Sequence, residues 1–145
     1  MSDPTLEIRM DLQYDHGSGE FGPYFEALGI GRAMARRCSN CGCVWFPPHA
    51  SCPKDGSLCE WLELDGTGLV TAITKTHSRL PFSDDYADRT FIMVAMSGAD
   101  NVAFGQLIAT SAIAAPGDRV CLVKLPAYYS RPVQTASFEL LEEDQ

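Results

Sequence analysis

Long apolar runs and basic residues are both scarce in this sequence. No stretch comes near the about 18 consecutive apolar residues that a membrane-spanning helix needs. The first residues, MSDPTLEIRMDL, show neither the basic region nor the apolar region of a secretory signal peptide. Lys and Arg number 11 against 19 Asp and Glu, and the net charge is −8. Because phosphate binding depends on Lys and Arg, this balance argues against nucleic acid as a partner. From the lack of a signal-peptide pattern and of a long apolar run, we expect a cytoplasmic protein.

Local catalytic motifs are missing as well. No Ser-His-Asp or Cys-His arrangement is suggested by neighbouring residues, and no glycine-rich phosphate loop is present. Gly66-Thr67-Gly68 is interpreted as a turn between strands. His16 and His77 are interpreted as ordinary polar residues. We therefore expect no catalytic residue in this chain.

The length and composition are those of one ordinary globular domain. The chain has 145 residues, of which 46% are hydrophobic and 21% charged. The charge is uneven, since residues 1–30 sum to −5 whereas residues 31–56 sum to +3. This basic segment coincides with a cluster of cysteines, which indicates a separate module.

The apolar pattern predicts one short helix followed by strands. Residues 22–29 are expected to be helical, because Pro23 suits a first turn and Gly29 suits the end. From residue 60 the apolar period changes to two, which is typical of strands. The predicted strands cover residues 61–64, 69–77, 90–96, 102–108, 119–125 and about 135–141.

These elements predict a mainly β protein with an N-terminal helix, a zinc ribbon and a small barrel. A five-stranded OB-fold barrel fits the strand lengths best, and an SH3-like barrel is the alternative. The expected units are residues 1–30 (tail and helix), 31–58 (ribbon) and 59–145 (barrel with an acidic tail). The first 20 or so residues look loosely ordered alone, although a partner could order them.

Two similar turns carry the metal-binding pattern. The first is Cys38-Ser39-Asn40-Cys41-Gly42, and the second is Cys52-Pro53-Lys54-Asp55-Gly56. Each is typical of a zinc-ribbon turn, in which backbone N–H groups point at sulfur and Gly permits a positive φ. In a reducing compartment, clustered cysteines favour metal over disulfides. We predict a structural Zn²⁺ held by Cys38, Cys41, Cys52 and Asp55.

The identity of the fourth ligand stays open at this point. Asp55 stands where a fourth Cys is expected, and a carboxylate can bind Zn²⁺ through oxygen. His49 and Cys59 are the competing ligands, and a site without metal is a further alternative. Cys43 and Cys121 are interpreted as ordinary side chains of the ribbon and the barrel core.

Two further pairs of residues are candidate contact sites. Arg36 and Arg37 directly precede Cys38, so they belong either to a solvated ribbon face or to a contact with coenzyme A phosphates or an acidic partner. Tyr128 and Tyr129 lie between prolines in a predicted loop. Exposed aromatic residues there favour a role at an interface or the edge of a pocket.

The order of these features resembles the DUF35 family, whose members combine a rubredoxin-like zinc ribbon with an OB-fold. The matching segments span roughly residues 21–140, and Asp55 departs from the family's usual fourth Cys. They are Tyr24-Phe25-Glu26-Ala27-Leu28, Gly31-Arg32, Cys38-x2-Cys41-Gly42, Trp45-Phe46-Pro47-Pro48, Cys52-Pro53-x-x-Gly56-Ser57, Glu60-Trp61, Gly66-Thr67-Gly68-Leu69-Val70, Gly105, Pro116-Gly117-Asp118-Arg119-Val120 and Phe138.

The resemblance implies a function for the chain within a larger complex. DUF35 proteins are accessory subunits of thiolase-like acyltransferases or aldolases, and the partner carries the catalytic Cys and His. Acetyl transfer between phloroglucinol-type phenols in secondary metabolism is one such reaction. The alternatives are a stand-alone acyl-CoA-binding or hydrolysing protein, an OB-fold nucleic-acid-binding module, and an iron protein of electron transfer.

Overall fold

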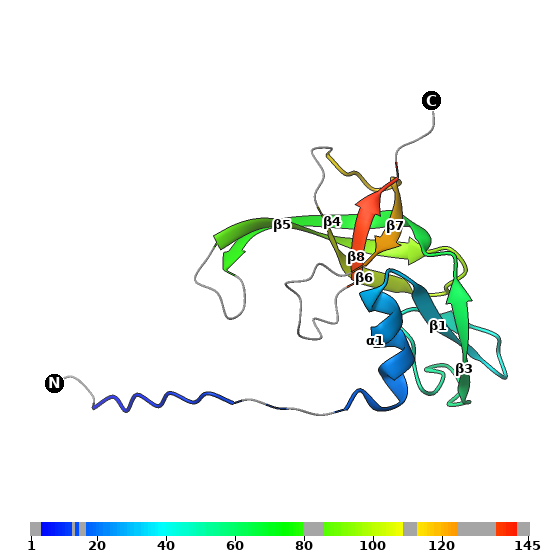
Figure 1. Cartoon of the computed structure of the whole chain (residues 1–145), viewed down its shortest axis with the longest axis horizontal. Coiled ribbons are helices and arrows are strands. Elements are labelled where there is room, and N and C mark those ends of the chain that lie inside the picture. Colours follow the sequence, from blue (N-terminus) through cyan, green and yellow to red (C-terminus); the bar gives the residue numbers. More distant parts are fainter. Residues whose placement is uncertain are drawn as a thin grey trace.

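The computed structural model describes residues 4–12, 14, 17–79, 86–108, 113–124 and 136–141. After an extended N-terminal segment come two helical and eight β elements within these residues (Figure 1). They are η1 (Gly19–Phe21), α1 (Gly22–Gly29), β1 (Ala33–Cys38), β2 (Val44–Trp45), β3 (Cys59–Leu64), β4 (Thr67–Arg79), β5 (Tyr86–Met96), β6 (Val102–Leu107), β7 (Arg119–Val123) and β8 (Ala136–Leu140). In the described part of the chain, no helix has the length and apolar character to cross a membrane.

Helix α1 has the predicted bounds. Pro23 lies in its first turn, where a missing N–H costs no helical hydrogen bond. Tyr24, Ala27 and Leu28 are buried, so one side of the helix packs against the protein. A helix of eight residues is marginal alone, and this packing supplies the stability that its length does not.

The ribbon forms its own sheet of three strands, in the order β2-β1-β3. Strand β1 pairs antiparallel with both neighbours, and Cys38 at its end lies opposite Cys59 at the start of β3. By the predicted bounds, residues 59–64 belong to the barrel unit. They pair instead with β1, because the apolar pattern of a strand does not specify the sheet in which it finds its partner.

The second sheet is a closed barrel of five strands in the order β4-β5-β6-β8-β7. All its neighbours are antiparallel except β6 and β8, which run parallel. A hairpin joins β5 to β6, and the predicted five-stranded barrel is confirmed. Closure leaves little free edge, except where β4 and β5 extend beyond their other neighbours.

One hydrophobic core joins the helix, the ribbon and the barrel. It runs from Leu28 of α1 through Phe46 beside β2 to Phe138 of β8, and all three side chains are almost fully buried. Gly105 of β6 is required here, since a Cβ at this position would lie 2.4 Å from the Phe138 ring. In the turn between β5 and β6, the Asp100 carboxylate accepts from the N–H of Val44 in β2, and the Asn101 side chain accepts from the N–H of Phe46 just after β2. The ribbon is therefore fixed to the barrel by packing and by hydrogen bonds.

Candidate metal centre

The first metal-binding turn follows directly from strand β1. The N–H of Cys38 donates to the carbonyl of Cys43 at 2.8 Å, and the N–H of Gly42 donates to the carbonyl of Cys38 at 3.1 Å. Gly42 has φ 74°, a conformation that side chains disfavour. The N–H groups of Asn40 and Cys41 both approach the sulfur of Cys38 at 3.4 Å. Burial raises the pKa of the Cys38 thiol, but these two N–H groups, together with the thiols of Cys41 and Cys52, leave that pKa lowered.

The second turn repeats the backbone pattern of the first. The N–H of Cys52 donates to the carbonyl of Ser57 at 2.8 Å, and the N–H of Gly56 donates to the carbonyl of Cys52 at 2.8 Å. Gly56 has φ 75°, nearly equal to that of the first turn. The second turn therefore presents Cys52 and Asp55 as the first turn presents Cys38 and Cys41.

The four predicted ligands come together. The sulfur atoms of Cys38, Cys41 and Cys52 and a carboxylate oxygen of Asp55 all lie within 4.8 Å of one another. Sulfur of Cys41 is 3.6 Å from that of Cys52, and sulfur of Cys38 is 3.6 Å from both oxygens of Asp55. A Zn–S bond of about 2.3 Å gives tetrahedral sulfur–sulfur edges of about 3.8 Å. The residues thus have the donor types and spacing for zinc, and this set would hold it.

Asp55 is held in place as an anion. The N–H of Ser57 donates to one carboxylate oxygen at 2.9 Å, and the amide of Asn40 donates to the other at 3.0 Å. These donors, with the N–H of Ser57 contributing most, lower the pKa of Asp55 far below its ordinary value. A deprotonated carboxylate is the form that binds a metal.

The two alternative fourth ligands lie outside the group of four. Cys59 is buried beside Cys38 and Cys52, and burial raises the pKa of its thiol, which favours the protonated form. His49 is exposed, and its ring packs edge-on against Trp45 at 5.4 Å between centroids. In the described residues, the group within ligand distance contains neither of them.

Comparison with known families bears on this geometry. Residues 25–58 match the family model described as ChsH2, rubredoxin-like zinc ribbon domain. This segment is therefore similar to a ChsH2-type zinc ribbon. A search of the curated proteins finds no match for the chain.

Two solved structures extend the likeness beyond the ChsH2-type ribbon. A chain of "Ltp2-ChsH2(DUF35) aldolase" has 21% identity and a TM-score of 0.65, over 88% of this chain and 98% of that chain. A DUF35 protein of unknown function from Sulfolobus solfataricus has 13% identity and a TM-score of 0.60, over 84% of this chain and 86% of that chain. Both share the fold of this chain, and the resemblance to the DUF35 family is confirmed by these matches together with the ribbon.

Arg36 of the ribbon is buried, whereas its place before Cys38 predicts an exposed residue on the ribbon surface. Its side chain is 8% exposed, and its guanidinium lies 4.2 Å from the centre of the Trp61 ring and 5.5 Å from that of Phe21. It also donates to the carbonyl of Glu20 at 3.3 Å. The reason is the register of the sheet, which places Arg36 opposite Trp61 on the side that η1 covers. Arg36 joins the helical segment to the ribbon and is not available to a phosphate.

The other candidate contact residues have different outcomes. Arg37 is exposed, and its Nε donates to the carbonyl of Gly42 at 3.4 Å. Tyr128 and Tyr129 lie outside the described residues. Cys43 is half-buried beside the metal-binding turns, where its sulfur accepts a hydrogen bond from Lys54 Nζ at 3.0 Å.

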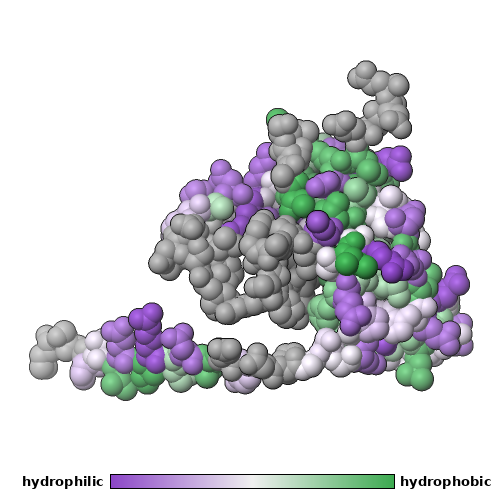
Figure 2. Space-filling view, viewed as in Figure 1, coloured by the Kyte–Doolittle hydropathy of each residue, from purple (hydrophilic) through white to green (hydrophobic). Residues whose placement is uncertain are grey.

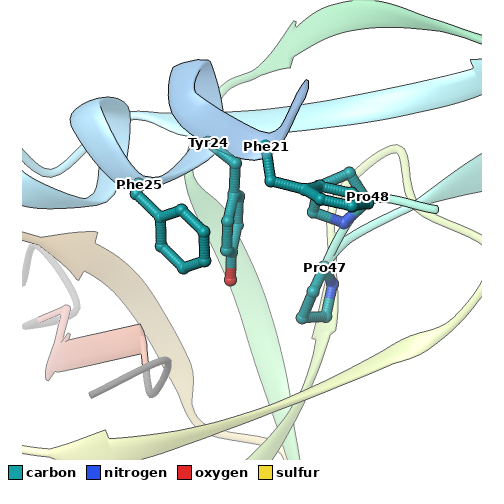
Figure 3. A pocket seen from close by; sticks show the side chains of 5 residues that line it. All are labelled: Phe21, Tyr24, Phe25, Pro47 and Pro48. Atoms are coloured by element: carbon teal, nitrogen blue, oxygen red, sulfur yellow. The ribbon is translucent and has the colours of Figure 1, made fainter. Parts of the chain in front are cut away.

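The structure has a hollow of about 310 Å³ beside α1 that the sequence did not lead us to predict. Figure 3 shows the rings of Phe21, Tyr24 and Phe25 projecting from the helical segment toward Pro47 and Pro48, which face them. Tyr24 is 4% exposed, and within the described chain its hydroxyl has no hydrogen-bond partner. Two features of the sequence could have indicated this hollow: the aromatic residues at helical spacing, and the two consecutive prolines at positions 47 and 48. Burial raises the pKa of Tyr24 to about 12, so its hydroxyl stays protonated at neutral pH.

Proposed function

We propose that this chain is a non-catalytic accessory subunit of a thiolase-like enzyme complex. The observation that carries the proposal is the fold match to the DUF35 chain of an aldolase, which extends over 98% of that chain. The likeness therefore covers the ribbon and the barrel together. The ChsH2-type ribbon at residues 25–58 supports the same assignment.

The features of the described residues suit a structural role. The four ligands of the metal centre are three Cys and one Asp, and they would fill a tetrahedral site without an open position for substrate. The zinc would stabilise the ribbon, and the shared core would transmit that stability to the barrel. The hollow beside α1 offers apolar walls and one unpartnered hydroxyl to a neighbouring molecule.

The finer proposal concerns the reaction of the complex. We infer C-acylation by a cysteine nucleophile of a thiolase-fold partner, with acetyl transfer between phloroglucinol-type phenols as the specific candidate. This follows from the DUF35 resemblance of the motifs. In this assignment the chain supplies architecture, and the partner supplies the nucleophile.

Co-expression with the thiolase-fold chains of the same genome tests the proposal. We expect one of them to co-elute with the tagged chain in a stoichiometric complex, and thioester cleavage to require both. Replacing the partner's nucleophilic Cys should abolish cleavage, whereas His77→Ala in this chain should leave it unchanged. A chain that stays alone with every such protein contradicts the proposal. Binding or hydrolysis of acyl-CoA by the isolated chain would support the stand-alone alternative.

A further inference from the structure

The N-terminal arm, residues 4–12, has a surface that a free segment does not require. Its apolar side chains alternate with polar ones, and Leu6, Ile8, Met10 and Leu12 are 70% to 84% exposed. Figure 2 shows the result as an apolar side and a hydrophilic side along the arm. A strict period of two is typical of a strand with one covered face, and in this chain that face is uncovered.

The arm also has unpaired backbone groups. Among the described residues, no hydrogen bond joins residues 4–12 to the body of the protein. An extended segment satisfies its N–H and C=O groups by pairing with the free edge of a sheet. The surface that could bind the arm is therefore a free sheet edge with apolar side chains nearby.

The barrel presents such an edge on β4. Strand β4 pairs with β5 from Gly68 to Arg79, but on its other side it pairs with β7 only from Thr67 to Leu69. Within the described chain, residues 72–79 of β4 thus have no strand on that side, and we call them the β4 free edge. Residues 7–12 of the arm would pair over about 20 Å of the β4 free edge.

The outer face of the barrel carries an apolar patch at one end of this edge. Thr74 of β4 lies opposite Phe91 of β5, and the Phe91 ring stacks on Phe104 of β6 with 5.3 Å between centroids. Phe104 is 50% exposed, and Leu69 and Val102 on the same face are 49% and 43% exposed. An apolar residue placed beside Thr74 would extend this patch.

Charge selects one register for an antiparallel arm. With Leu12 opposite Thr74 and Met10 opposite Thr76, residues 7–12 of the arm lie opposite residues 74–79 of β4, and the apolar residues among them share the outer face. Asp11 then lies opposite the exposed Lys75, which is an attractive cross-strand pair. Arg9 lies opposite His77, whose ring is 2.7 Å from the exposed carboxylate of Asp88.

We propose that the arm of one copy of this chain adds to the β4 free edge of a second copy, and that the second copy returns the same contact. The exchange is closed under a two-fold axis, so both arms and both edges are used. Two added strands contribute to one interface, which doubles the area that a single added strand would bury. The dimer also covers an edge that would otherwise invite uncontrolled pairing.

Light scattering on the full-length chain, coupled to size exclusion over a range of concentrations, tests the dimer. We expect a dimer that becomes a monomer when Leu6, Ile8, Met10 and Leu12 are all replaced by Ser. The matched control replaces Ile30 and Leu58 by Ser, since these side chains are 65% and 76% exposed but lie outside the proposed interface. The control should remain dimeric.

A charge exchange tests the register. Lys75→Glu should raise the dissociation constant of the dimer about tenfold, because each dimer would lose two attractive pairs and gain two repulsive ones. Asp11→Lys alone should weaken the dimer similarly, and the double variant should restore it. All these positions are exposed, so the folded chain should be retained, as circular dichroism would show.

The opposite results overturn the proposal. A wild-type chain that is monomeric at about 100 micromolar excludes the dimer. Binding of the arm to a thiolase-fold chain instead would be one such case. A dimer that persists after the four Ser substitutions shows that the arm is not the dimer contact. A double charge variant that stays as weak as the single ones excludes this register. None of these results bears on the accessory function, which the co-expression experiment tests separately.

Discussion

Asp100 and Val44 exchange two hydrogen bonds between the barrel and the ribbon. The N–H of Val44 donates to the carboxylate of Asp100 at 2.8 Å, and the N–H of Asp100 donates to the carbonyl of Val44 at 2.8 Å. Val44 is 5% exposed, so its N–H has little access to water. The carboxylate in the turn after β5 thus completes the edge of the ribbon sheet.

Replacing Asp100 by Ala should destabilise the whole chain. The buried N–H of Val44 would lose its acceptor, which costs about 1–3 kcal/mol of unfolding free energy. Asp88→Ala is the matched control, because the Asp88 side chain is 92% exposed and its pair with His77 is exposed too. The control should change stability little. Urea unfolding of both variants gives the comparison, and equal losses would contradict the role of Asp100.

Arg36 should contribute to stability, whereas Arg37 should not. Arg36→Ala removes a buried guanidinium that lies between Trp61 and the helical segment, and we expect a loss of about 1–3 kcal/mol. Arg37 is exposed, so Arg37→Ala should change the unfolding free energy by less than about 0.5 kcal/mol. The same unfolding measurement compares the two neighbours. Near-equal effects would show that the burial of Arg36 carries no energy.

The sequence predicts well those features that neighbouring residues determine. Helix α1 begins and ends as Pro23 and Gly29 indicate, because helix ends depend on local backbone preferences. The two metal-binding turns also follow from local spacing, and both Gly42 and Gly56 have the positive φ that such turns require. These features can be predicted because the residues that determine them are close together in the sequence.

Features that depend on residues far apart in the sequence could not be predicted from local patterns. The burial of Arg36 depends on the ring of Trp61, 25 positions later, and on the segment around Glu20, 16 positions earlier. The sheet to which β3 belongs depends on its pairing with β1, which its own alternation does not encode. The fourth ligand was open among three residues until the structure brought Asp55, and neither alternative, into the group.

Substitutions at the fourth ligand should separate Asp55 from Cys59. Asp55→Ala leaves three sulfur ligands, so we expect zinc to be released to a chelator faster than from the wild type. Asp55→Cys supplies a fourth thiolate and should retain zinc more tightly. Cys59→Ser is the control and should keep one zinc per chain. Metal analysis after chelator treatment measures the order, and loss of zinc from Cys59→Ser alone would reverse the assignment.

Tyr24 should make the stability of the chain depend on alkaline pH. Burial raises its pKa from 10.0 to about 12, so the folded chain keeps a proton that the unfolded chain releases. The contribution of this group is complete below pH 10 and is lost as the pH rises toward 12. Two pKa units correspond to about 2–3 kcal/mol of unfolding free energy.

Tyr24→Phe isolates this contribution, since it removes the hydroxyl and keeps the ring. Because the hydroxyl has no partner in the described chain, the variant should be at least as stable as the wild type at pH 7. Its loss of stability between pH 10 and 12 should be smaller by the same about 2–3 kcal/mol. Unfolding curves across this range, with tyrosinate absorbance as an independent reading of ionisation, measure both effects. A variant that is less stable at pH 7 would mean that the hydroxyl is hydrogen-bonded in solution, and the hollow beside α1 would then contain its partner.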